Sequence, residues 1–133
     1  MDQNAFSEYV ITALRERFPK LINFKIFDSG EAFIDYSSPN GKITLRISTQ
    51  AKEITIGFAK DEKFGWHIHM NMFEANTPTE EIAAAIKVID GIISNKETII
   101  FSSLLGYAVS DEEEVKEYQQ PDEVIEKCYW NEL

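Results

Sequence analysis

Hydrophobic positions near the start of the chain recur every three or four residues. Between residues 4 and 18 this repeat is made by Phe6, Tyr9, Val10, Ala13, Leu14 and Phe18. This spacing is typical of a helix with one apolar face. Pro19 follows and cannot continue a helix, because it has no backbone N–H to donate. The pattern therefore predicts an amphipathic helix that ends at Pro19.

From Pro19 to about residue 71, the hydrophobic positions recur with a period of two residues. Apolar and polar side chains alternate in short runs around residues 24–26, 32–36, 43–47, 54–58 and 64–70. Alternation indicates strands with one buried face, and the short links between the runs favour an antiparallel meander. One link contains Asn40-Gly41, which predicts a hairpin because both residues accept the positive φ that tight turns require.

The next segment carries the signals of a helix start. Thr77 is suited to cap the helix, Pro78 suits its first position, and Glu80 stands in capping-box register. The pattern predicts a helix that covers the sheet and stops near Asn95. Its wide apolar stripe consists of Ile82, Ala85, Ile86, Val88, Ile89, Ile92 and Ile93.

Shorter elements are predicted after this helix. Residues 98–101 have the pattern of a short buried strand, which residues 107–109 either extend or follow. Residues 111–119 are typical of a short acidic helix, whereas residues 124–130 fit a strand or a helix equally well.

These elements together predict a single α+β domain over residues 1–133. It consists of an N-terminal helix, an antiparallel meander of about five strands, an amphipathic helix on the sheet, a short strand and an acidic C-terminal helix or strand segment. A chain of 133 residues is long enough to build one hydrophobic core. The pattern leaves the strand order open.

Composition narrows the possible functions. The chain has 23 acidic and 13 basic residues, a net charge of −10, and such a protein repels phosphate backbones, so no nucleic-acid ligand is expected. No apolar run approaches the ~20 residues of a membrane helix, and the first residues lack a secretory signal, which predicts a cytoplasmic protein without membrane contact. The lone Cys128 excludes a disulfide scaffold, and the scattered glycines lack nucleotide-binding spacing, so no cofactor is expected.

Acidic residues are concentrated at the end of the chain, where residues 110–133 hold nine acids and two bases. One interpretation is a solvated helix start, with Ser110 and Glu113 spaced as a capping box. The other is an anionic surface that meets a cationic partner, and both can hold. Tyr118 and Trp130 are candidate apolar anchors of such a contact. The expected partner-binding residues are Asp111, Glu112, Glu113, Glu114, Glu117, Tyr118 and Trp130.

The only two histidines offer an alternative chemistry. His67 and His69 alternate along one strand and so share a face, and Glu74 follows closely. Two imidazoles and a carboxylate suit zinc or iron, although paired histidines on the wet side of a strand are the simpler interpretation. Cys128 lies in no nucleophile motif, and no catalytic residue is predicted.

Part of the chain resembles the small bacterial immunity proteins of polymorphic and contact-dependent growth-inhibition toxin systems. The similarity covers residues 43–103 and lies in the run Ile54–Phe58, the strand Trp66–His69, the helix Glu80–Ile93 and the short strand Glu97–Ser102. These immunity proteins are cytosolic antidotes encoded beside the toxins that they neutralise.

The resemblance implies a non-enzymatic antitoxin whose partner is a toxin domain. Many toxin domains that cut nucleic acid are basic, so an acidic inhibitor could occupy the groove meant for phosphates. Two alternatives stay open. One is a small metal-binding enzyme or ligand-binding domain that uses His67, His69 and Glu74; the other is an accessory protein that associates with itself or another chain through a sheet edge.

Overall fold

The two long helices begin and end where the sequence predicts. A computed structural model describes all 133 residues. Helix α1 (Gln3–Arg17) ends before Pro19. Helix α2 (Pro78–Ile93) begins after Thr77, whose hydroxyl accepts a hydrogen bond from the backbone N–H of Glu80 at 3.2 Å. Asn95 follows α2 with φ 63°, and this left-handed conformation stops the helix.

The predicted meander is confirmed as a five-stranded antiparallel sheet in which each strand pairs with the next along the chain. The order follows the sequence because the links are too short for a crossover. The strands are β1 (Phe24–Ile26), β2 (Ala32–Ser37), β3 (Thr44–Ser48), β4 (Thr55–Lys60) and β5 (Lys63–His69).

The hairpin at Asn40-Gly41 is present, but its turn is wider than the pair predicts. Residues 38–43 connect β2 and β3, and of the two only Gly41 has a positive φ, 72°. The backbone N–H groups of Asn40 and Lys42 both donate to the carbonyl of Leu133 at 3.1 Å. The end of the chain therefore satisfies groups that a tight turn would have paired internally.

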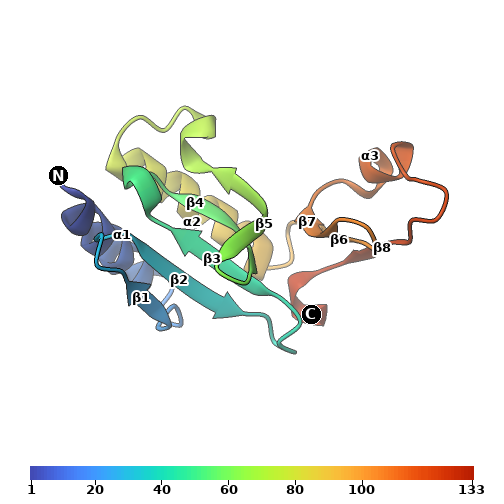
Figure 1. The fold of residues 1–133 in the computed structure, drawn as a ribbon, viewed down its shortest axis with the longest axis horizontal. Helices are drawn as coiled ribbons and strands as arrows, with labels where there is room; N and C mark the ends of the chain where they lie inside the picture. Colours follow the sequence, from blue (N-terminus) through green and yellow to red (C-terminus); the bar gives the residue numbers. More distant parts are fainter.

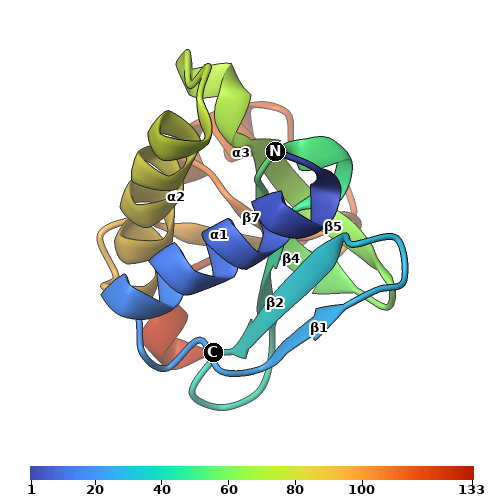
Figure 2. The same ribbon diagram turned by 90° about the vertical axis from the view of Figure 1, so that its left-hand side faces the viewer.

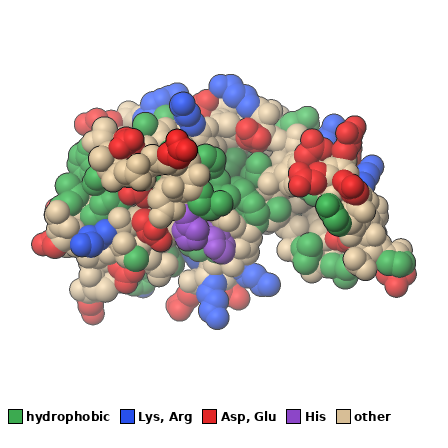
Figure 3. Space-filling model, turned by 90° about the horizontal axis from the view of Figure 1, so that it is seen from above, with side chains coloured by type: hydrophobic (Ala, Val, Ile, Leu, Met, Phe, Trp, Pro, Cys, Tyr) green, Lys and Arg blue, Asp and Glu red, His purple; other side chains and the backbone are tan.

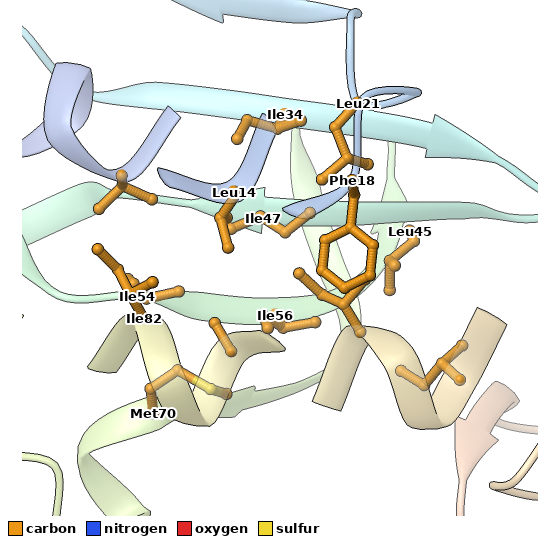
Figure 4. Packing of buried hydrophobic residues seen from close by; sticks show 14 of the residues in the cluster. Leu14, Phe18, Leu21, Ile34, Leu45, Ile47, Ile54, Ile56, Met70 and Ile82 are labelled. Atoms are coloured by element: carbon orange, nitrogen blue, oxygen red, sulfur yellow. The ribbon is translucent and has the colours of Figure 1, made fainter. Parts of the chain in front are cut away.

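Both long helices cover the same face of the sheet and lie side by side (Figure 2). Their apolar stripes and the inward-facing strand residues form one core of 22 buried residues, part of which is drawn in Figure 4. From the sheet this core takes Ala32, Ile34, Leu45, Ile47, Ile56 and Phe58, from the residue before β4 Ile54, and from the helices Phe6, Val10, Ile11, Leu14, Ile82, Ala85, Ile89 and Ile92.

The C-terminal part of the chain forms a second sheet that projects from the first (Figure 1). It contains β6 (Ile99–Ser102), β7 (Gly106–Val109) and β8 (Ile125–Cys128), in the antiparallel order β7-β6-β8. The short acidic helix α3 (Glu112–Glu117) links β7 to β8. We call residues 99–128 the C-terminal lobe. Residues 107–109 thus follow the buried strand as a separate strand, and the ambiguous segment 124–130 is mainly a strand.

Trp130 belongs to the core, so its prediction as a surface anchor is wrong. After β8 the chain returns to the main sheet in a 3-10 turn (Trp130–Glu132), where Trp130 is 3% exposed. Its ring stacks on Tyr36 with ring centroids 5.9 Å apart. A large apolar ring at this junction gains more from burial between β2 and the end of α2 than from contact with water.

A helix that crosses a bilayer needs about 20 predominantly apolar residues. None of the helices of this structure is both long enough and apolar enough to do so.

Candidate protein-binding surface

Helix α3 is capped by Asp111, and the predicted capping box of Ser110 and Glu113 is wrong. The Asp111 carboxylate accepts a hydrogen bond from the backbone N–H of Glu113 at 2.8 Å. Ser110 still belongs to the preceding extended chain, where its N–H donates to the carbonyl of Thr98. The helix therefore starts one residue later, and its acidic first turn lies at the positive end of the helix dipole.

The carboxylates of α3 are largely free of counter-charges. Among the salt bridges of the structure, only the 3.7 Å contact between Lys116 and Glu112 involves this helix. Asp111, Glu113, Glu114 and Glu117 are exposed, Glu112 is half-buried, and Tyr118, which ends the helix, is 72% exposed. Figure 3 shows the resulting cluster of acidic side chains on the C-terminal lobe. The structure thus brings six of the seven predicted contact residues together and separates Trp130 from them.

An exposed apolar tip lies on the same lobe, and the sequence analysis missed it. Leu104 and Leu105 form the turn between β6 and β7, and Leu105 is 84% exposed. The backbone N–H of Ser103 donates to the carbonyl of Val124, which is also exposed and so lies beside this turn. The signal was two adjacent leucines directly before Gly106, a glycine with φ 83°. Apolar residues beside charged ones are typical of protein interfaces.

The side chain of Glu123 connects the segment that follows α3 to the turn that carries the apolar tip. Its carboxylate accepts hydrogen bonds from the hydroxyl of Ser102 and from the backbone N–H of Gln120. The Ser102 oxygen in turn accepts from the backbone N–H groups of Leu104 and Leu105, each at 3.1 Å. The bond from Ser102, and then the bond from Gln120, hold the pKa of Glu123 below its usual range.

We expect Glu123→Gln to destabilise the protein most at neutral pH. A carboxyl whose pKa is lower in the folded state contributes stability that is fully present above its unfolded pKa, about 4.3 for glutamate. That contribution is lost as the pH falls through the folded pKa. Urea unfolding at several pH values should therefore show the gap between wild type and variant closing in acid. The control is Glu126→Gln on exposed β8, and a gap that stays constant with pH would contradict the prediction.

The two histidines share a face of β5 as predicted, with ring centroids 5.3 Å apart. His69 Nδ1 lies 2.8 Å from the hydroxyl of Thr55, and His67 Nδ1 lies 3.1 Å from the carbonyl of Gly65. Glu74 is exposed in the loop before α2, and no group of three or more His, Cys, Asp or Glu side chains is placed to hold a metal ion. The predicted alternative ligand set is therefore not assembled.

The position of Cys128 suits a structural role and not a nucleophile. Its Sγ donates to the carbonyl of Ile99 at 3.2 Å, and burial raises the pKa of the thiol. A thiol that stays protonated is a poor nucleophile.

Comparison with known proteins found no match. No family model, curated protein or solved structure is significantly similar to this chain.

Proposed function

We propose that this protein is an immunity protein that binds and neutralises a basic toxin domain, acting by contact and not by catalysis. The C-terminal lobe is the contact surface, with Asp111, Glu112, Glu113, Glu114, Glu117 and Tyr118 as its acidic and aromatic residues. The resemblance of residues 43–103 to immunity proteins indicates the biological task. The lobe itself indicates how the task is performed.

The observation that supports the proposal most strongly is the unpaired charge on α3. Four exposed carboxylates without counter-ions adjoin the exposed Tyr118, and the same lobe carries the apolar tip. Like charges gathered on a projecting lobe attract a basic protein over several ångströms and raise its association rate. Tyrosine supplies contact area at a low cost in side-chain entropy.

Neutralising three of these carboxylates tests the proposal without unfolding the helix. The triple variant Glu113→Gln, Glu114→Gln and Glu117→Gln leaves Asp111 as the cap and the Glu112–Lys116 pair intact. We expect its affinity for the toxin domain encoded beside its gene to fall by about 10- to 100-fold, mainly through slower association, and to depend less on salt. Binding is measured by surface plasmon resonance at low and high salt.

The matched control removes the same charge elsewhere. Glu8, Glu16 and Glu62 are exposed on α1 and on the β4–β5 turn, and their change to glutamine alters the net charge equally. We expect the control to bind the toxin domain almost as wild type does. Equal losses in both variants would show that only the total charge matters, and unchanged binding in the α3 variant would exclude this helix as the contact site.

A further inference from the structure

An open hollow runs along the outward side of α2 to the junction with the C-terminal lobe. It consists of two adjoining parts that share Phe73, Lys87 and Val88. The first, about 420 Å³, lies between the loop before α2 and the first turns of the helix. The second, about 300 Å³, lies where α2 faces β5 and β7.

The walls of the hollow are mostly apolar. Strand β5 contributes Trp66 and Ile68, β7 contributes Val109, and α2 contributes Ala84 and Val88. Strands β5 and β7 lie close together but belong to different sheets, and the second part of the hollow lies at this junction. Figure 3 shows hydrophobic side chains gathered in the hollow between the two parts of the molecule.

The rim of the hollow is acidic. Glu74 and Glu80 border one end, and Glu97 borders the other. Glu97 also lines a neighbouring polar hollow together with Asp111, Glu112 and Glu113 of the α3 region. The two parts of the hollow and the neighbouring polar hollow are lined by these six carboxylates and by three lysines, Lys87, Lys96 and Lys127. Glu112 already pairs with Lys116, and Lys96 already pairs with Asp90, so five carboxylates remain against two lysines.

We propose that this hollow binds an amphipathic, basic segment of the partner protein. Its apolar side chains lie against α2 and β5, and its basic side chains face the carboxylates of the rim. An apolar floor with anionic edges complements a segment of this kind, and a neutral or acidic segment would leave the rim charges unpaired. The inference rests on the proposed function, because it extends the α3 contact surface into the hollow through Glu97.

A synthetic peptide with two repeats of Leu-Lys-Lys-Leu-Leu-Lys-Lys tests the site directly. We expect its titration to shift the amide NMR signals of Phe73, Ala84 and Val88 more than those of α1 or the outer face of the sheet. A matched peptide with glutamate in place of lysine should cause no such shifts, and neither should one with serine in place of leucine. Shifts spread evenly over the acidic surface would overturn the proposal.

Ala83→Arg blocks the hollow from an exposed position on α2 that lines it. We expect it to weaken binding of the lysine-leucine peptide by about tenfold or more. Thr12→Arg on the exposed side of α1 adds the same charge and should change little. Equal affinity of the peptide for wild type and Ala83→Arg would refute the hollow as its site.

The two proposals fail separately. If the hollow binds the peptide but the triple glutamine variant of α3 binds the toxin domain like wild type, the hollow stands and the proposed α3 contact falls. If the α3 variant no longer binds the toxin domain and the peptide does not bind in the hollow, only the inference about the hollow is overturned.

Discussion

Trp130→Ala is expected to lower the free energy of unfolding by about 3–5 kcal/mol, the range for removing a buried aromatic ring from a core. The ring is 3% exposed, stacks on Tyr36 and belongs to the single core cluster. Few other residues of the C-terminal part reach that cluster, mainly Ile99 and Leu133. The variant therefore loosens the attachment of the C-terminal lobe as well as the core.

Urea unfolding followed by far-ultraviolet circular dichroism measures this effect, since the variant retains only Trp66 as a fluorescent tryptophan. Trp66→Ala is the matched control, because Trp66 is half-buried and should cost less. A loss below about 1 kcal/mol would contradict the core position of Trp130. If Trp130 were a partner anchor instead, the variant would keep its stability and lose affinity for the toxin domain.

Arg46→Ala is expected to cost about 3 kcal/mol, the lower end of the range for breaking a buried ion pair. Arg46 is 7% exposed on the face of the sheet opposite the helices. Its guanidinium donates to both carboxylate oxygens of Asp35, at 2.8 and 2.9 Å, and to the carbonyls of Asp61 and Lys63. Without it, a carboxylate and two carbonyls lose their partner, and the β4–β5 turn loses its tie to β3. Asp35 keeps some contact with water, which limits the loss.

The control for this prediction is Arg17→Ala. Arg17 is exposed and lies 3.7 Å from Asp90, and pairs of this kind contribute less than about 1 kcal/mol. The hydrogen bonds to Asp35 raise the pKa of Arg46 above its already high ordinary value. The guanidinium therefore stays charged at neutral and mildly alkaline pH, and its contribution to the free energy of unfolding should not vary there. Equal losses in the two arginine variants would contradict the structural role of Arg46. An Arg46→Met, Asp35→Leu double variant should recover much of the lost stability, because it leaves no buried charge unpaired.

Only part of the candidate surface could be predicted from the sequence. The acidic residues of α3 were predicted because they are close together along the chain. The apolar tip at Leu104 and Leu105 was missed because one turn shows no periodicity. The hollow beside α2 was missed because its walls come from α2, β5 and β7, which are distant along the chain.

By itself, the amino-acid sequence determined the local structure of this protein. The signals that specify local structure act over a few residues: helix caps such as Thr77, hydrophobic periods of two and of 3.6 residues, and short links between strands. These signals specified the two long helices, the meander and the acidic helix. Only the tertiary structure decided what depends on packing between distant segments: the second sheet, the burial of Trp130 against Tyr36, and the hollow at the junction. The hydrophobic effect favours burial of an apolar side chain against any apolar surface, whichever part of the chain supplies that surface. Whether an aromatic residue faces the core or a partner therefore depends on which surfaces the fold brings together.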